Sequence, residues 1–409
     1  MDTDVLIAGG GQVGLALALA LRRAAPTLGV TLVDAVPPDA ATREGRASTI
    51  VAGGRRMLTA IGVWDAIAPQ AQPVTEMIVT DSRVRDVVRP VFLTFATDAG
   101  GDGASAHVVA DGVVVAALRQ ASIAAGVVTI APDSVTDFAV DGRVATAVLA
   151  GRGSVRARLL VAADGVRSRL RAFAGITTVG RSYGQTGIVA TVIHERPHNG
   201  RAEEHFLPGG PFAILPLIDD GEGRHRSSLV WTEPDDVAER LVGGDAIVLA
   251  AELTRRFGRH LGAVSLSGKA LAFPLSVAVA RSFIAPRFAL AGDAAHTIHP
   301  IAGQGLNLGY RDVAALAETI VDAERLGLDI GTLNVLRRYD RWRRYDTQEM
   351  ALMTDALNVL FANDNAALRL ARDVGLGLVD RLPGLKRLFV GEASSDGRGA
   401  PRLLRGEAI

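Results

Sequence analysis

The chain has 409 residues, of which 44 are Lys or Arg and 44 are Asp or Glu, so its formal net charge is zero. A protein that binds nucleic acid through phosphates needs an excess of positive charge, and we expect no such partner. The lack of cysteine excludes disulfides and thiolate-bound metals. The sequence has neither a basic leader nor an apolar run of the ~20 residues that span a membrane, which favours a cytoplasmic protein.

The N-terminal residues predict a strand, a tight turn, a helix and a second strand. Apolar residues 5–8 lead into three consecutive glycines, an Ala/Leu-rich stretch covers residues 13–25, and Val30 begins the next apolar run. Two strands around one helix form a βαβ unit, so we expect a parallel sheet.

The glycines at this turn follow the pattern Gly9-x-Gly11-x-x-Gly14, and Asp34 ends the second strand. In this context Gly9 makes the tight turn, Gly11 leaves room for a pyrophosphate, and Gly14 lets the helix pack closely on the sheet. The helix N-terminus offers free N–H groups to phosphates, and Asp34 can accept hydrogen bonds from a ribose. The segment therefore predicts a dinucleotide site but does not distinguish NAD from FAD.

The remaining elements are expected in two groups. Residues 74–97 and 180–232 have the β-branched and apolar runs of a second sheet, and short apolar strands end at Asp164 and at Asp293. The last residues, 391–409, are rich in Gly, Arg and Ser and are expected to fray. Helices are expected at residues 52–68, 113–125, 305–323 and over most of 333–390.

Two of these strand ends begin longer motifs. One reads Ala162-Ala163-Asp164-Gly165 and continues to Arg171, and the other reads Gly292-Asp293-Ala294-Ala295-His296 and continues to Gly309. An Asp at a strand end can bond a sugar-like hydroxyl, and Gly303 and Gly305 would let the backbone approach a flat ring. The helix that starts near Gly305 would point its positive end at that ring.

With these motifs the chain resembles the single-component flavoprotein aromatic hydroxylases, the group that includes para-hydroxybenzoate hydroxylase. Within that group it is most similar to the ubiquinone-biosynthesis hydroxylases, from residue 4 to about residue 390. The resemblance rests on the glycine fingerprint, on Arg46, on the two Asp-Gly and Gly-Asp motifs, and on residues 205–217 and 228–232.

The resemblance implies an α/β fold with a Rossmann-like FAD-binding domain built on a parallel sheet, a smaller substrate domain with a mostly antiparallel sheet, and C-terminal helices. The FAD-binding domain is expected to be discontinuous. It would comprise residues 1–72, 100–178 and 270–322, the substrate domain 73–99 and 179–269, and the C-terminal helical region 323–409.

The resemblance also implies where FAD binds. In the family, Asp293 holds a ribityl hydroxyl, Asp164 and Gly165 serve the pyrophosphate and nicotinamide sides, and Arg171 lies near the phosphates. The residues expected to bind FAD are Gly9, Gly11, Gln12, Val13, Gly14, Asp34, Arg46, Asp164, Gly165, Gly292, Asp293, Pro300, Gly303, Gln304, Gly305, Leu306 and Asn307.

The implied reaction is carried by the flavin. NAD(P)H would reduce FAD, oxygen would form a C4a-hydroperoxide, and an electron-rich phenol would attack it, so the protein's task is to exclude water. No residue is identified as a general acid or base. The expected function is ring hydroxylation of a polyprenylated phenol in ubiquinone biosynthesis. The alternatives are a hydroxylase of a small soluble aromatic acid and a non-catalytic scaffold of a biosynthetic complex.

The substrate side is expected to be apolar, and each candidate can equally be core of the second sheet. Other ubiquinone-biosynthesis proteins are expected partners. The stretch that contains Leu382, Leu385, Leu388 and Phe389 is amphipathic and can touch a membrane surface, although core packing explains it as well. The substrate candidates are Phe206, Leu207, Phe212, Ile214 and Leu215.

Some positions depart from the family. Gly112 stands where the family has an arginine that helps the FAD pyrophosphate, and Asp111 is expected to cap the following helix instead. Gly112 is also the feature that favours a scaffold. His296 and His299 have an H-x-x-H spacing, but Pro300 follows and no further ligand lies near, so we expect no metal and a structural His296.

Overall fold

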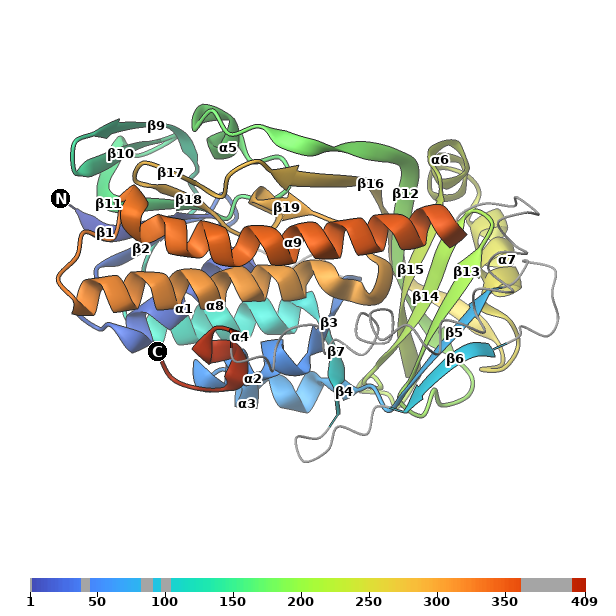
Figure 1. Ribbon diagram of the computed structural model, residues 1–409. Coiled ribbons are helices and arrows are strands. Elements are labelled where there is room, and N and C mark those ends of the chain that lie inside the picture. The colour runs from blue at the N-terminus through green and yellow to red at the C-terminus, as the bar shows by residue number, and fades with distance from the viewer. Residues whose placement is uncertain (1, 38–44, 82–90, 97–103, 362–398) are drawn as a thin grey trace.

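The computed structural model describes residues 2–37, 45–81, 91–96, 104–361 and 399–409. Figure 1 shows two sheets at opposite ends of an elongated molecule, with two long helices along one side. The fold class expected from the sequence is confirmed, because one sheet is mainly parallel and the other mainly antiparallel.

Sheet A forms the centre of the first domain. Its strands β18 (Phe288–Leu290), β11 (Ser154–Ala162), β1 (Thr3–Ala8), β2 (Val30–Val33) and β8 (Val128–Ile130) are parallel and lie in this order. Strand β17 (Ile284–Ala285) adds an antiparallel edge, and β9 (Val135–Asp141) pairs with β10 (Val144–Leu149). The central strands are apolar on both faces because helices cover both sides.

Helices α1 (Gln12–Ala24), α4 (Asp111–Ala124) and α8 (Gln304–Arg325) pack in the first domain, and α9 (Leu333–Phe361) packs on α8. The helix expected at 52–68 is divided into α2 (Ala52–Ala60) and α3 (Trp64–Ile67), because Gly62 has a φ of +67° and ends the first. Short α5 (Arg169–Phe173) follows β11. Among the described helices, none is both long and apolar enough to cross a membrane.

Sheet C forms the second domain, with strand order β19-β16-β12-β15-β14-β13-β5-β6. Sheet C continues through β16 to Ala280, beyond residue 270, where the sequence analysis places the boundary. A small sheet of β3 (Ala47–Val51), β7 (Ala106–Ala110) and β4 (Gln72–Pro73) lies between the domains. The sheet C strands are β5 (Glu76–Asp81), β6 (Val91–Ala96), β12 (Thr178–His194), β13 (Arg201–Leu207), β14 (Gly210–Leu217), β15 (His225–Pro234), β16 (Val264–Ala280) and β19 (His296–Thr297).

The two faces of sheet C pack against different partners. Helices α6 (Asp235–Gly243) and α7 (Ala246–Phe257) cover one face, which we call the outer face, through a cluster that includes Trp231, Leu253 and Phe257. The other face, which we call the inner face, carries Phe206, whose ring belongs to the core of the first domain. Side chains alternate along a strand, so each position is assigned to one face.

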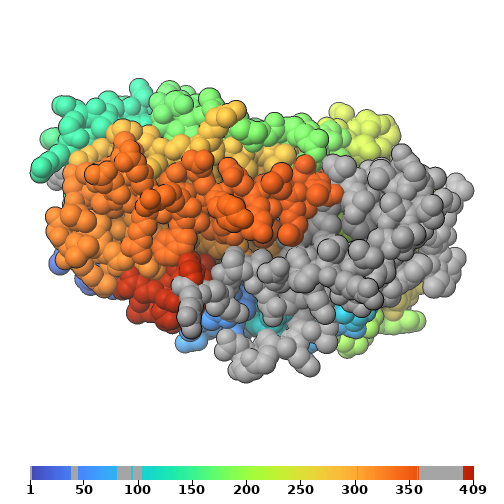
Figure 2. All heavy atoms as spheres, viewed as in Figure 1, coloured from blue at the N-terminus to red at the C-terminus, as the bar shows by residue number. Residues whose placement is uncertain are grey.

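Residues 399–409, the described part of the C-terminal segment, do not fray, which corrects the expectation from composition for these residues. Leu403 and Leu404 are buried, and Trp342 Nε1 donates a hydrogen bond to the Gly399 carbonyl over 2.8 Å. The Arg402 amide donates to Glu318 of α8 over 2.7 Å. Figure 2 shows this red segment against the orange helices. The amphipathic stretch at 382–389 lies outside the described residues.

Candidate active site

The loop after β1 forms the first half of the site. Gly9 has a φ of +117°, and a methyl group there would lie 2.2 Å from the Ala163 carbonyl oxygen. A methyl group at Gly14 would lie 1.9 Å from the Gly9 carbonyl oxygen, so α1 packs closely on β1 only with glycine at this position. A methyl group at Gly11, by contrast, would meet nothing within 4 Å, because Gly11 faces open space.

This open space lies at the N-terminus of α1. Gly11 is the N-cap, no side chain caps the helix, and its first turn has no acidic residue. The amides at Gln12 and Val13 are therefore available for an anion. Asp34, at the end of β2, lies beside Gly10, and its Oδ1 accepts a hydrogen bond from the Val36 amide over 3.2 Å. The arrangement leaves Asp34 with acceptor capacity for a ribose.

The second half of the site is the segment from the end of β18 through the first turn of α8, which we call the flavin loop (residues 291–307). Pro300 precedes a short 3-10 turn, and Gly303, with a φ of +61°, is the N-cap of α8. Gln304 and Leu306 lie in its first turn, and a methyl group at Gly305 would meet nothing within 4 Å. Here too, the helix N-terminus has no side-chain cap and no acidic residue.

Asn307 holds the flavin loop against the small central sheet. Its Oδ1 accepts from the Val51 amide over 3.1 Å, and its Nδ2 donates to the Thr49 carbonyl over 2.9 Å. Val13 of α1 packs against Gly292, and also against Gly309, where a methyl group would lie 2.6 Å from Val13 Cγ2. The two halves of the site are thus in direct contact.

Asp293 is exposed at the end of the strand, where a hydroxyl can reach it. Arg46 lies close enough to act on its charge. The Arg46 guanidinium is 5.2 Å from the centroid of the Phe273 ring, and its Nε is 3.5 Å from Asp111 Oδ2. Asp111 also accepts from Ser48 Oγ over 2.6 Å. The expectation that Asp111 caps the helix is wrong, because it is the first helical residue and makes no capping bond.

A buried network of hydrogen bonds and charges supports the flavin loop, and no pattern in the sequence predicts it. Asp312 Oδ2 accepts from the Gly292 amide over 2.8 Å and lies 2.6 Å from His296 Nε2, while Arg343 Nε donates to Asp312 Oδ1 over 2.8 Å. Burial opposes ionisation of Asp312, but His296 and Arg343 outweigh it and keep its pKa below the ordinary value. His296 therefore has the structural role expected, and Asp312 is its buried partner.

The motif that contains Asp164 lies next to the loop after β1, where Ala163 and Asp164 are close to Gly9. Asp164 is exposed at the end of β11, and Gly165 has a φ of +85° with open space around it. Arg171, which the resemblance implies near the phosphates, lies in α5. Its Nη1 donates to the Ala294 carbonyl over 2.8 Å, so Arg171 links α5 to the flavin loop.

The five substrate candidates lie on opposite faces of sheet C. Phe206 packs in the core of the first domain, and Leu215 packs with a small cluster between the domains, so both lie on the inner face. Leu207, Phe212 and Ile214 are buried with α6 and α7 on the outer face. For these three residues the structure shows core of the second sheet.

His299 lies in the flavin loop and is fully buried, and neither ring nitrogen has a hydrogen-bond partner among the described residues. The centroid of its ring lies 5.1 Å from the centroid of the Tyr183 ring, and the two rings form a T-shaped pair. Burial lowers the pKa of His299 to about 4, so the ring is neutral at physiological pH. In the described part of the chain, no three metal-binding side chains come together.

These features fit FAD. Gly11, Gly165 and Gly305 leave open space where a ligand can approach the backbone, and two uncapped helix N-termini offer amides at two separate points. A dinucleotide with a pyrophosphate near one point and an electron-poor ring near the other suits these two groups of donors. The half-buried carboxylate of Asp34 and the exposed carboxylate of Asp293 supply acceptors for sugar hydroxyls.

Comparisons with known proteins agree. The model of the FAD binding domain family matches residues 2–344. The chain is 44% identical to ubiquinone hydroxylase UbiL of Rhodospirillum rubrum, over 98% of this chain and 92% of that protein. It is 34% identical to 3-demethoxyubiquinol 3-hydroxylase of Escherichia coli, over 94% and 96%. The solved structure of p-nitrophenol 4-monooxygenase PnpA from Pseudomonas putida DLL-E4 matches with a TM-score of 0.76 at 21% identity, over 95% of this chain and 99% of that chain.

The family model and the curated relatives show that the chain is an FAD-dependent monooxygenase of the aromatic hydroxylase class. The chain belongs to the ubiquinone-biosynthesis hydroxylase family of these enzymes, as its resemblance implies.

Proposed function

We propose that the chain hydroxylates the aromatic ring of a polyprenylated phenol in ubiquinone biosynthesis. The observation that carries the proposal is 44% identity, along nearly the whole chain, to a ubiquinone hydroxylase. Electrons would come from NAD(P)H, as is typical of the family. The apolar side chains of Phe206 and Leu215 on the inner face of sheet C suit a hydrophobic ring better than a small charged acid.

Bound FAD would supply the oxygen chemistry, and this chain's residues would bind and position it. The amides at the start of α1 would hold the pyrophosphate, Asp34 the ribose, and Asp293 a ribityl hydroxyl. The N-terminus of α8 would favour negative charge on a ring beside Gly305. The Asp312 network would hold the flavin loop in place.

The domain interface would keep water from the reaction. Phe206 of sheet C is buried in the core of the first domain, so the two domains share apolar packing beside the inner face. A dry site protects reactive intermediates of the reaction from breakdown by water. A polyprenylated substrate resides in a membrane, and contact with a membrane surface and with other ubiquinone-biosynthesis proteins is part of this proposal.

The test is NAD(P)H oxidation by the FAD-loaded protein. We expect a phenol with a short prenyl tail to accelerate the reaction about tenfold or more and to yield the hydroxylated ring. A small aromatic acid with the same effect, and no effect of the prenylated phenol, would favour the alternative substrate class. Unchanged ubiquinone after deletion of the gene would contradict the biosynthetic assignment.

A further inference from the structure

Polar side chains on the outer face of sheet C are paired. Glu203 Oε2 lies 3.0 Å from His205 Nε2, and its Oε1 lies 2.8 Å from His260 Nε2. His205 Nδ1 in turn contacts the Thr80 hydroxyl at 2.8 Å. Glu233 accepts from Trp231 Nε1 over 2.7 Å. Each buried polar group named here therefore has a protein partner, as folded proteins require.

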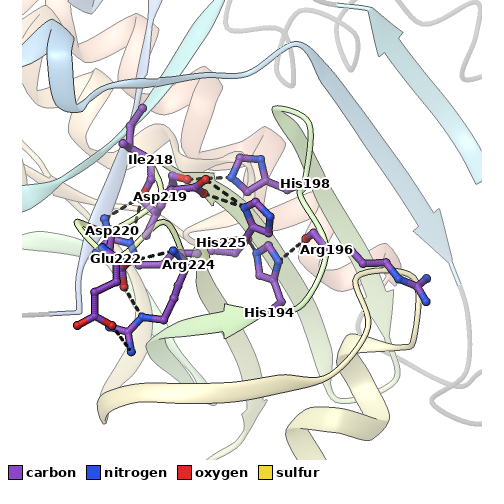
Figure 3. A network of polar contacts seen from close by, with 12 residues as sticks. His194, Arg196, His198, Ile218, Asp219, Asp220, Glu222, Arg224 and His225 are labelled. Atoms are coloured by element: carbon purple, nitrogen blue, oxygen red, sulfur yellow. Dashed lines mark hydrogen bonds and ion pairs between the residues drawn. The ribbon is translucent and has the colours of Figure 1, made fainter.

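The histidines at one end of the sheet follow the same rule. Figure 3 shows His194 and His225 in a network of polar contacts. His194 Nε2 lies 3.0 Å from Ser227 Oγ, its Nδ1 lies 2.7 Å from the Arg196 carbonyl, and His225 Nδ1 lies 3.1 Å from Asp219. This network is therefore satisfied within the protein.

On the inner face, by contrast, some buried polar side chains have no partner among the described residues, and Glu204 is the main example. Glu204 lies between Glu203 and His205 in β13, so its side chain points to the opposite face, the same face as Phe206. The strand register places it between Val79 of β5 and Ala213 of β14, which are both apolar. Glu204 is 4% exposed, and no group in the described part of the chain bonds its carboxyl or pairs with it.

Two hydroxyls on the same face are also unpartnered. Ser228 Oγ and Thr232 Oγ1 are buried without a hydrogen bond among the described residues. In the strand register, Glu204 lies opposite Ala213 of β14, and Ala213 lies opposite Val230 of β15. Ser228 and Thr232 lie on either side of Val230 in β15 and point to the same face as Val230. A lone buried polar group destabilises the folded protein, and such groups occur mainly at sites where a ligand completes the bonding.

We propose that Glu204 binds the ring hydroxyl of the phenolic substrate and so orients the ring on the inner face of sheet C. This inference rests on the proposed function. Burial alone raises the pKa of Glu204 to about 8, so at neutral pH the carboxyl is mostly protonated. It can therefore accept a hydrogen bond from a phenol through its carbonyl oxygen and donate one to a ring oxygen. No covalent step at Glu204 is involved.

The consequence is selectivity for a free hydroxyl. A site built to bond a hydroxyl discriminates against an analogue that lacks it, because the buried protein group then stays unpaired. A phenol should therefore bind more tightly than its methyl ether, and this preference should depend on Glu204. A purely structural role for Glu204 would affect both ligands equally.

The test measures dissociation constants of a diprenyl phenol and its methyl ether, from the shift of the flavin absorption spectrum of the FAD-loaded protein. In Glu204→Leu we expect the phenol to bind about 10- to 100-fold more weakly and the ether within about threefold of the wild type. Glu204→Gln should retain most of the preference, because an amide still hydrogen-bonds. The neighbouring outer-face variant Glu203→Gln is the matched control and should retain all of it.

A second measurement uses only the wild type and Glu204→Gln, in case the leucine variant does not fold. The infrared carbonyl band that disappears in Glu204→Gln should shift when the phenol binds and stay unshifted with the ether. Equal losses for both ligands, or an unshifted band, would overturn the role of Glu204 while the proposed function stands. If the wild type binds neither ligand, the proposed function fails as well.

Discussion

Arg343 Nε donates a hydrogen bond to Asp312 Oδ1 over 2.8 Å, and both side chains are almost fully buried. Asp312 also accepts from the Gly292 amide, so a charged pair between α8 and α9 holds the start of the flavin loop. Removing one partner of a buried pair leaves the other charge uncompensated, which typically costs about 3–5 kcal/mol.

We therefore expect Asp312→Asn to lower the free energy of unfolding by about 3 kcal/mol and to weaken FAD binding about tenfold or more. Thermal unfolding and FAD fluorescence titration measure the two effects. Glu324→Gln is the control, because Glu324 lies on the same helix but pairs with Arg158 at its other end, and it should leave FAD affinity unchanged. Native FAD affinity in Asp312→Asn would contradict the role of the network.

Gly11 faces open space in the protein alone, so its substitution should affect the ligand and not the fold. We expect Gly11→Ala to keep the wild-type melting temperature of the FAD-free protein and to raise the FAD dissociation constant about tenfold or more. Gly221→Ala is the matched control, because a methyl group at Gly221 also meets nothing within 4 Å. An equal FAD affinity in both variants would rule out a close approach of the cofactor to Gly11.

Gly112 occupies the first turn of α4, next to Asp111, which pairs with Arg46. Gly112→Arg should lower the FAD dissociation constant about 3- to 10-fold, because the resemblance implies that an arginine at this position helps to hold the pyrophosphate. Gly112→Ala gains helix propensity without charge and isolates that contribution. The same change in FAD affinity in both variants would show that helix stability, not charge, is responsible.

Glu204 should make stability depend on pH. Its pKa is raised by burial to about 8 in the folded protein, against an ordinary value of 4.5, so the folded protein keeps a proton that the unfolded chain releases. Its contribution to stability is fully present below about pH 4.5 and is lost as pH rises toward 8, by up to about 4 kcal/mol. Relative to wild type, Glu204→Gln should gain stability over this range, as urea unfolding at several pH values would show.

Glu203 supplies the opposite case for the same experiment. Burial opposes its ionisation, but hydrogen bonds and charge from His205 and His260 outweigh burial and hold its pKa below the ordinary value. Its contribution is present above the ordinary pKa of a carboxyl and is lost as pH falls. Glu203→Gln should therefore cost stability at neutral pH. The same pH trend in both variants would contradict the assignment of the two residues to opposite faces.

The cofactor half of the site could be predicted from the sequence because it consists of motifs whose residues are close together within each motif. The glycine fingerprint and the flavin loop are local motifs, and their glycines are required by backbone geometry at Gly9 and Gly303. The Asp312 network was missed because its members come together only when α8 and α9 pack, and no spacing in the sequence marks them.

The substrate half was harder to predict for a different reason. A strand alternates its side chains between two faces, but sequence alone does not say which face meets the other domain, so Phe206 and Phe212 were grouped together. Glu204 went unnoticed because an acidic pair, Glu203-Glu204, resembles an ordinary solvated edge. The burial of Leu403 and Leu404 was missed because the prediction for the last residues relied on their high content of Gly, Arg and Ser and not on these two leucines.

Val13 contacts both Gly292 and Gly309, so the segment that would receive the pyrophosphate rests directly on the segment that would receive the flavin ring. The spacing between the two ends of the cofactor is thus fixed by packing before any ligand arrives. Little chain has to be ordered when FAD binds, which keeps the entropic cost of binding low. Amide hydrogen exchange in α1 and α8, beyond their uncapped first turns, should already be slow in the FAD-free protein, and the two helices should open together when they open at all.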